Sequence, residues 1–315
     1  MEFFKTTPRI QFMARRKWCY VISGLLMAAS FALLATRGLN LGLDFTGGVI
    51  LDVDNPSAIA EQRVRDSLNA AGFDVQVQAT GGSPRELIIR VPARATEGVQ
   101  NPNEVANAIV AELKKVDAAI ELRGSPDFVG GQVGEELTEQ GGLAMLFTMI
   151  MIMIYVGFRF QWKMAAGTVF AALHDPIMIF GFFSLTQLTF DLSVLAAVLA
   201  VIGYSINDTV VVFDRVREVF HTKRKATTAE MLDAALNQTL SRTLMTSFST
   251  LFVVGSLYVF GGETLRGFAI AIIIGVVVGT YSSIFIAAAL ALDLKLTAAD
   301  LMPQQDEKSE VDALP

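Results

Sequence analysis

The sequence predicts a polytopic α-helical membrane protein with six transmembrane helices and an α+β domain inserted between the first and second helices. Three observations lead to this fold class. The chain of 315 residues is 52% hydrophobic with a mean hydropathy of +0.48, which few soluble domains reach. Six apolar runs are long enough, or nearly so, to cross a hydrocarbon core of about 30 Å. A long stretch between the first two runs has the composition of a soluble domain.

The first element is a basic leader, residues 1–17, followed by an apolar run over 18–35. A secretory signal also begins with a basic segment. This apolar run is long for a signal, however, and no A-x-A cleavage site follows it. We therefore expect an uncleaved first transmembrane helix with its N-terminus in the cytoplasm.

Residues 36–140 form the predicted soluble domain. Four segments have strand character, namely 47–55, 75–79, 86–91 and 119–123. Helical patterns follow the first and third of these strands, and Ser57 is the expected cap of the first helix. The order βαββαβ is that of a split, ferredoxin-like sheet with its helices on one face. No catalytic spacing occurs in this segment, so we expect a binding or moving domain rather than an enzyme.

Five further apolar runs are expected to form the second to sixth transmembrane helices. These runs cover residues 141–158, 164–185, 192–213, 244–260 and 268–292. Basic residues gather in the leader and in the loops 159–163 and 214–243, whereas the alternate loops hold one basic residue, Arg266. Because basic loops stay in the cytoplasm, we expect both termini there, with a cytoplasmic tail over 293–315. The 36–140 domain then lies on the export side.

The loop 214–243 contains a helical pattern of its own. Thr227 and Glu230 have the spacing of a capping box, and apolar residues then recur at helical intervals as far as Leu240. We expect an amphipathic helix that lies along the membrane face and leads into the fifth span. An ordinary interfacial connector is favoured over any catalytic role for this loop.

Ionisable residues inside the apolar runs are the candidate functional residues. Asp208 lies within the fourth run, and a carboxylate at mid-depth costs about 2.5–3.5 kcal/mol on insertion scales. Arg242 lies at the cytoplasmic entrance of the fifth run, on a helix with small hydroxylated residues. Burial favours a neutral carboxyl group and a nearby cation favours a charged one. Asp208 beside Arg242 could therefore alternate, under a proton gradient, between a charged state paired with Arg242 and a neutral, protonated state. A static ion pair that fixes helix register is an equal alternative.

His174 and Asp175, followed by Pro176, are weaker candidates in the third run. Asp175 can take part in proton transfer, orient His174 or lie near a helix end, and the structural interpretations are favoured. The net charge of −6 is divided between the two sides of the membrane and does not indicate a nucleic-acid partner. One cysteine and two histidines disfavour an internal disulfide and a metal site. We expect no cofactor.

Two motifs resemble those of the SecD/SecF family. GLDFTGG at 42–48 is similar to the signature that opens the export-side domain in this family, and GYSINDTVVVFDRVRE at 203–218 resembles the fourth-helix signature of its SecF branch. HDP at 174–176, SRT at 241–243 and the six-span layout agree with this resemblance. The signature residues of these motifs are Asp44, Phe45, Thr46, Gly47, Gly48 and Asn207.

The resemblance implies a multi-pass protein of the resistance–nodulation–division superfamily in the lipid bilayer of the bacterial inner membrane, with its large domain in the periplasm. It implies a heterodimer with SecD, and association with the SecYEG channel, YajC and the translocating preprotein. The implied function is to assist preprotein export and release with the proton-motive force. Charged residues of the fourth and fifth spans conduct protons in this family, and those positions are Asp208 and Arg242 here, opposite a carboxylate in SecD.

Two other functions stay open from the residues alone. A small-molecule exporter of the same superfamily usually has two large outer domains and twice as many spans, for which 315 residues leave no room. A static scaffold for the channel would leave Asp208 and Arg242 as structural residues. An enzyme is least expected, because no serine–histidine, paired-carboxylate or metal constellation lies at a membrane surface.

Overall fold

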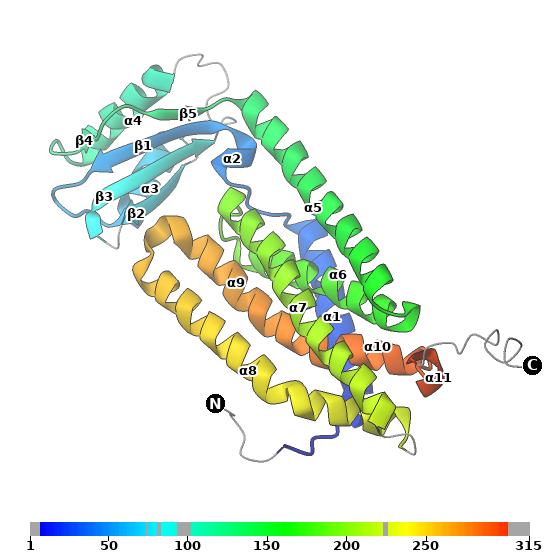
Figure 1. Ribbon diagram of the computed structural model, residues 1–315. Helices are drawn as coiled ribbons and strands as arrows, with labels where there is room; N and C mark the ends of the chain where they lie inside the picture. Colours follow the sequence, from blue (N-terminus) through cyan, green and yellow to red (C-terminus); the bar gives the residue numbers. More distant parts are fainter. Residues whose placement is uncertain (1–6, 74, 81–82, 93–101, 223–225, 302–315) are drawn as a thin grey trace, which may run out of the picture.

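The computed structural model describes residues 7–73, 75–80, 83–92, 102–222 and 226–301. An α+β domain lies at one end of a bundle of long helices (Figure 1). Six helices in the described part of the chain are long and apolar enough to cross a membrane, as predicted. The start of the leader, the basic residues at 223–225 and the tail after 301 lie outside the described residues.

The six spanning helices are mostly longer than the apolar runs that predicted them. They are α1 (Arg16–Thr36), α5 (Gly131–Arg159), α6 (Trp162–Thr186), α7 (Leu192–Thr222), α8 (Thr228–Phe260) and α9 (Gly262–Ser282), and the last continues through the π-helical turn η3 (Ser283–Ala287) into α10 (Ala288–Asp293). Hydropathy marks the part of a helix inside lipid, whereas the helix itself continues into the aqueous interface. Two short helices, η1 (Met13–Arg15) and α11 (Ala298–Leu301), lie at the end of the bundle away from the domain.

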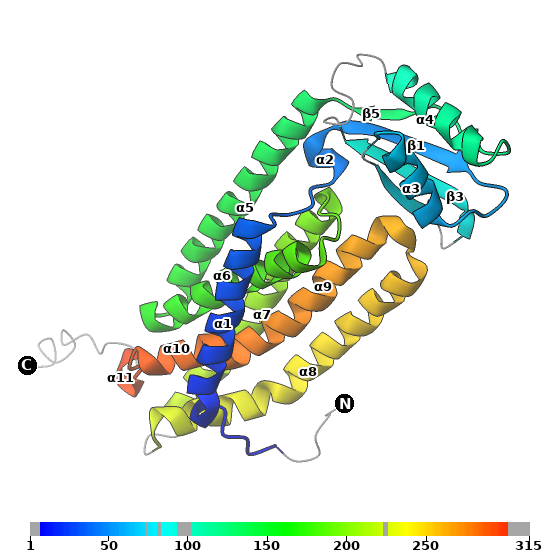
Figure 2. The same cartoon turned by 180° about the vertical axis from the view of Figure 1, so that it is seen from behind.

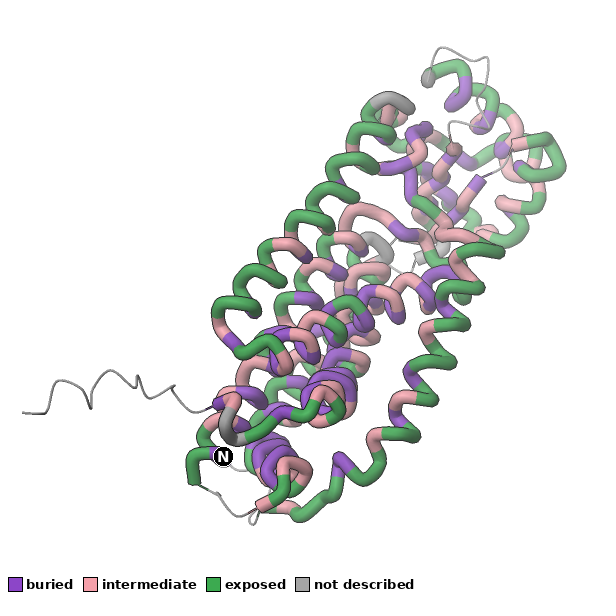
Figure 3. The backbone as a smooth tube through the Cα atoms, turned by 90° about the vertical axis from the view of Figure 1, so that its right-hand side faces the viewer, coloured by how far each residue is buried: buried purple, intermediate pink, exposed green. Residues whose placement is uncertain are grey.

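Three of the spans form the centre of the bundle. The apolar windows of α6, α7 and the α9 span are 61%, 50% and 50% buried, against 11% to 17% for α1, α5 and α8. Figure 2 shows α1 on the outer side of the bundle. Figure 3 shows that the buried positions gather in the interior of the bundle. Polar side chains on the inner faces of α6, α7 and α9 therefore contact protein rather than lipid.

The α+β domain has the predicted βαββαβ order. Its elements are β1 (Gly48–Asp54), α3 (Glu61–Ala70), β2 (Gln76–Thr80), β3 (Ser83–Pro92), α4 (Pro102–Val116) and β4 (Glu121–Leu122). The strands pair antiparallel in the order β2-β3-β1-β4. The register sets Leu51 opposite Ile89 and Val53 opposite Leu87. Since side chains alternate between the faces of a sheet, these residues share one face and form a core with α3 and α4.

Two further elements of the domain are too short for a periodic pattern to predict. The helix α2 (Leu43–Thr46) precedes β1, and the strand β5 (Asp127–Val129) pairs with the beginning of β1. Both lie where the domain joins the bundle, β5 shortly before α5 and α2 shortly after α1. They therefore belong to the two connections between the domain and the membrane helices.

The predicted helix start at Ser57 is wrong. The helix α3 begins four residues later, and the residue before it makes no side-chain cap. The side chain of Asn55 instead binds both the N–H and the C=O of Ile59, and Ala58 adopts a φ of +52°. Such a side-chain-to-backbone turn competes with helix formation, so the helix cannot begin at Ser57.

The predicted capping box at the start of α8 is confirmed. The N–H of Thr227 donates to Glu230 at 2.9 Å, and the N–H of Glu230 donates to Thr227 Oγ1 at 3.3 Å. The amphipathic segment is not a separate helix, because α8 continues from it into the fifth span and changes direction on the way (Figure 1). Buried apolar residues such as Leu232 and Leu236 hold its first half against the bundle.

Candidate functional site

Asp208 lies at the contact between α7 and α8 and is only 6% exposed. Its Oδ1 accepts a hydrogen bond from Thr243 Oγ1 at 2.9 Å. Its buried Oδ2 has no hydrogen-bond partner among the described residues. A buried carboxylate with one unsatisfied oxygen is costly. The site would therefore gain stability from a proton, a cation or another hydrogen-bond donor.

Arg242 precedes Thr243 in the chain but points in another direction. It is exposed and lines a cavity of about 460 Å3 together with Asp214 and Arg215. Both Arg242 and Asp208 are described, and they form no ion pair with each other. Successive residues of an α-helix point about 100° apart. Because Thr243 faces Asp208, Arg242 is turned away from it, toward the open cavity. The hydrogen-bond partner of Asp208 is therefore the hydroxyl group of Thr243, which the sequence analysis did not pair with it.

A second polar contact joins the same helices on the domain side of Asp208. Tyr204 OH donates to Ser247 Oγ at 3.2 Å, and the hydroxyl groups of Ser247 and Thr280 lie 2.7 Å apart. This chain connects α7, α8 and α9. The small hydroxylated residues of the fifth span therefore allow close helix packing. Two of them, Thr243 and Ser247, also make hydrogen bonds to α7, to Asp208 and Tyr204 respectively.

Asp175 belongs to a separate, fully buried cluster between α6, α7 and α9. Its Oδ1 lies 3.0 Å from His174 Nδ1, and its Oδ2 accepts hydrogen bonds from Ser205 Oγ at 2.5 Å and Ser282 Oγ at 3.0 Å. Both of its oxygens are therefore satisfied, unlike those of Asp208. A Cβ on Gly279 would lie 3.1 Å from the Cβ of Ser205, so glycine leaves room for this cluster.

The sixth span changes to π-helical geometry directly after this cluster. Ser283 Oγ lies 2.8 Å from Thr209 Oγ1 on α7. The turn η3 then brings the carbonyl oxygen of Ala287 against α6, where a Cβ on Gly167 would lie only 2.4 Å from it. Short π-helical turns are rare and occur frequently at functional sites. The sequence signal for this one is the serine pair at 282–283 within an otherwise apolar run.

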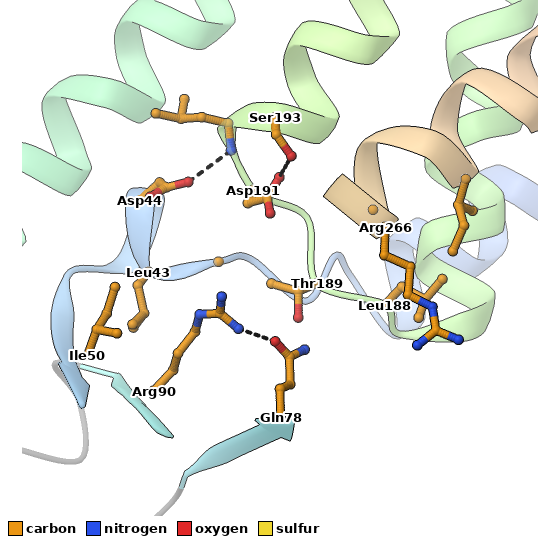
Figure 4. A pocket seen from close by; sticks show the side chains of 14 residues that line it. Leu43, Asp44, Ile50, Gln78, Arg90, Leu188, Thr189, Asp191, Ser193 and Arg266 are labelled. Atoms are coloured by element: carbon orange, nitrogen blue, oxygen red, sulfur yellow. Dashed lines mark hydrogen bonds between the residues drawn. The ribbon is translucent and has the colours of Figure 1, made fainter. Parts of the chain in front are cut away.

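The GLDFTGG signature lies where the domain meets the bundle (Figure 4). Asp44 Oδ2 accepts a hydrogen bond from the N–H of Leu192, the first residue of α7, at 3.0 Å. Phe45 stacks on Phe190 of the connection between α6 and α7, with ring centroids 6.1 Å apart. Thr46 Oγ1 donates within the motif, to a carbonyl oxygen four residues back. The signature thus attaches the domain to α7 through α2.

The two glycines that end the signature have conformations that other residues rarely adopt. Gly47 has φ of 67° and ψ of 167°, a region that is essentially restricted to glycine. Gly48 has φ of +147°, and a Cβ there would lie 2.2 Å from the carbonyl oxygen of Val91. Both glycines are therefore required for the chain to pass from α2 into β1 against β3.

Asn207 of the second motif is not in the buried site. It is exposed on α7, in line with the exposed residues Ala196, Ala200 and Gly203, which recur at intervals that share one helix face. A Cβ placed on Gly203 has no neighbour within 4 Å. Small residues on a membrane helix allow a second helix to approach closely, so this face is suited to a partner helix.

The described polar residues link α6, α7, α8 and α9 around two buried carboxyl groups, those of Asp208 and Asp175. The described residues include no group of three or more His, Cys, Asp or Glu side chains that could hold a metal ion. Asp208 accepts a hydrogen bond from one hydroxyl group, that of Thr243, and Asp175 accepts from two, those of Ser205 and Ser282.

Two protein families match the chain. Residues 108–297 match the family described as protein export membrane protein SecD/SecF, C-terminal, and residues 32–54 match the SecD/SecF GG motif. The first match covers more than half of the chain and includes all five spans after the domain. The second covers the end of α1, α2 and β1, and so includes the glycines described above.

Relatives of known identity match the whole length of the chain. Protein translocase subunit SecF of Vibrio alginolyticus is 44% identical over 100% of this chain and 99% of its own length. The proteins of the same name from Haemophilus influenzae and Pseudomonas aeruginosa are 42% and 43% identical, over 98% and 97% of this chain and 93% and 98% of theirs. These values are well above the level at which membership of a family is in question.

The structure is similar to that of SecDF, a translocon-associated membrane protein from Thermus thermophilus, with a TM-score of 0.78 and 33% identity over 94% of this chain. A SecDF structure in a super-membrane-facing form gives a TM-score of 0.71 and 32% identity over 93% of this chain. The chain spans 40% of the length of each of these SecDF chains. The protein therefore belongs to the SecD/SecF family of protein export membrane proteins, as a SecF-type translocase subunit rather than an enzyme.

Proposed function

We propose that this subunit uses the proton-motive force, together with SecD, to assist preprotein export and release across the bacterial inner membrane. The observation that carries the proposal is the buried carboxyl group of Asp208, with one hydrogen-bonded oxygen and one oxygen that has no partner in the described part of the chain. Such a group can bind or release a proton with little rearrangement around it. Each charge that crosses the membrane is worth about 2.3 kcal/mol per 100 mV, which is sufficient to shift an equilibrium between two helix packings.

Arg242 is the second member of the proposed relay. It lies in the cavity beside Asp214 and Arg215, next in sequence to the residue that binds Asp208. A charged Asp208 attracts the guanidinium group toward the helix contact, and a protonated Asp208 releases it into the cavity. This alternation changes how α8 packs on α7. The absence of an ion pair between the two described residues supports a switch over the static pair.

His174 and Asp175 take a supporting part in this proposal. Asp175 already has hydrogen bonds at both oxygens, and two of its partners are serine hydroxyl groups on α7 and α9. Proton transfer through Asp175 would have to break these contacts between three helices. We therefore assign the cluster to holding α6, α7 and α9 together while α8 moves.

The proposed partner of the exposed face of α7 is SecD. Asn207 and Arg242 are both exposed on this part of the bundle, and lipid satisfies neither an amide nor a guanidinium group. A second helix bundle with small residues at its surface and a carboxylate facing Arg242 would satisfy both. The same family relationship supports association of the pair with SecYEG, YajC and the translocating preprotein.

The proposed orientation puts both termini in the cytoplasm and the α+β domain in the periplasm. Arg159 and Lys163 flank the turn between α5 and α6, at the end of the bundle away from the domain. The segment 261–267, which joins α8 to α9 and includes the first turn of α9, lies near the domain and contains one basic residue, Arg266. This asymmetry supports the assignment, since basic loops remain on the cytoplasmic side.

Export by vesicles that contain the full chain, SecD and the channel tests the relay. Asp208→Asn and Arg242→Met should each reduce preprotein export to the level seen without a proton gradient. Asp191→Asn is the control, because this residue caps the same helix outside the cavity that Arg242 lines, and asparagine keeps an acceptor oxygen for the N–H of Val194; it should keep the response to the gradient. A full response in assembled Asp208→Asn would refute the relay and favour a scaffold, and drug efflux by the complex would favour a small-molecule exporter.

A further inference from the structure

The first turn of α7 is capped from two directions. Asp191 precedes the helix and its Oδ1 accepts hydrogen bonds from Ser193 Oγ at 2.6 Å and from the N–H of Val194 at 2.9 Å. This is the usual cap that a helix receives from its own chain. The N–H of Leu192, however, donates to Asp44, which lies 148 residues away in sequence. Figure 4 shows the Asp44 carboxylate directed at this N–H from α2.

The helix α2 is held firmly on both sides of Asp44. The N–H of Gly42 donates to the carbonyl oxygen of Phe190 at 2.8 Å, and the N–H of Phe190 donates to Asn40 at 2.8 Å. On the other side, a Cβ on Gly134 of α5 would lie 2.7 Å from the carbonyl oxygen of Phe45. Only Gly47 separates α2 from the strand β1. A movement of the domain's central strand is therefore transmitted directly to Asp44.

We propose that Asp44 is the coupling residue between α7 and the α+β domain, through the hydrogen bond from its carboxylate to the first N–H of α7. Two facts carry this inference. The bond joins the helix that contains Asp208 to the segment that leads into β1. It is not the only cap of α7, since Asp191 already caps that helix. The proposal rests on the proposed function, in which α7 and α8 change their packing.

The coupling predicts that the position of the domain depends on Asp44. Distances between spin labels on the domain and on the bundle measure that position. Suitable label sites are Ala70→Cys at the end of α3 and Thr186→Cys at the end of α6, which are both exposed. Cys19→Ser removes the one native thiol. The full chain is assembled with SecD in vesicles, and Asp208→Asn serves as the mimic of protonated Asp208.

Native Asp44 should give one narrow distance distribution that shifts when Asp208→Asn is introduced. Asp44→Ala should broaden the distribution and remove the dependence on residue 208. Asp191→Ala is the matched control, because it removes hydrogen bonds from the same helix turn without detaching the domain; it should keep both the narrow distribution and the shift. Asp44→Asn retains an acceptor oxygen and should also keep both.

Three results separate this inference from the proposed relay. If Asp44→Ala leaves the distribution narrow and its shift intact, the coupling role is wrong. If Asp44→Ala and Asp191→Ala broaden it equally, the effect belongs to helix capping in general and the coupling role is again wrong. If Asp44→Ala alone broadens it while Asp208→Asn shifts nothing in any background, Asp44 does hold the domain and the relay fails instead. Should Asp44→Ala not assemble, Asp44→Ser, which is too short to make the same bond, replaces it.

Discussion

The glycine at the start of β1 allows a quantitative test of why the signature ends in two glycines. In Gly48→Ala, the new Cβ would lie 2.2 Å from the carbonyl oxygen of Val91 and 2.7 Å from a methyl carbon of Leu43. Since Cβ atoms essentially never approach other atoms within 3.0 Å, β1 and β3 must separate by about 0.8 Å at this point. The neighbouring atom is backbone, so a change of side-chain rotamer cannot relieve the contact.

The expected destabilisation has two parts. A positive φ in a residue with a Cβ costs roughly 1–2 kcal/mol, and overpacking that moves the backbone adds about 1–3 kcal/mol. Gly72 is the matched control, because its φ is +92° but a Cβ there meets nothing within 4 Å. Gly72→Ala should therefore show only the first part. The free energies of unfolding of the two variants should differ by the overpacking part alone, about 1–3 kcal/mol.

Hydrogen exchange of the full chain in detergent measures this difference within the domain. The amides of β1 and β3 should exchange faster in Gly48→Ala than in Gly72→Ala, by roughly one to two orders of magnitude if they open with the whole domain, since about 1.4 kcal/mol corresponds to a factor of ten. The membrane helices report on intact assembly and should exchange alike in both variants. Equal exchange of β1 and β3 in the two variants would refute the steric account of the second glycine.

Two further contacts at the end of the bundle away from the domain make separate predictions. The side chain of Asn237 accepts a hydrogen bond from the N–H of Ile10 at 2.9 Å and donates one to its C=O at 2.8 Å, and so holds the leader. Asn237→Ala should weaken this contact by about 1–3 kcal/mol and speed tryptic cleavage at Arg9. Gln238→Ala is the control and should leave the rate of cleavage unchanged. A hydrogen bond from Lys163 at 2.6 Å is the largest cause that lowers the pKa of Asp300. The carboxylate therefore stabilises the fold at pH above its unfolded pKa, and this contribution is lost as the pH falls through the lowered pKa. Thermal unfolding of the native protein and of Asp300→Asn should differ at pH 7 and converge in acid; a difference that does not depend on pH would contradict this.

The sequence by itself determined the membrane spans, the order of the domain's elements and the identity of the two buried acids, Asp208 and Asp175. Each of these depends on local information. Hydropathy over some twenty residues is enough to mark a span, alternation marks a strand, and an aspartate such as Asp208 within an apolar run is recognisable without knowledge of its neighbours. The capping box at Thr227 is local in the same sense, because all of its partners lie within four residues.

Only the tertiary structure decided which groups meet. The rotation of α8 about its own axis is set by packing, and it brings Thr243 rather than Arg242 to Asp208. The serines that satisfy Asp175 come from two other helices. The bond between Asp44 and Leu192 joins residues 148 positions apart. The hydrophobic pattern of one segment contains no information about its contact with the other. Hydrophobic patterns specify which face of an element is buried, whereas the pairing of polar groups depends on how the buried faces fit together.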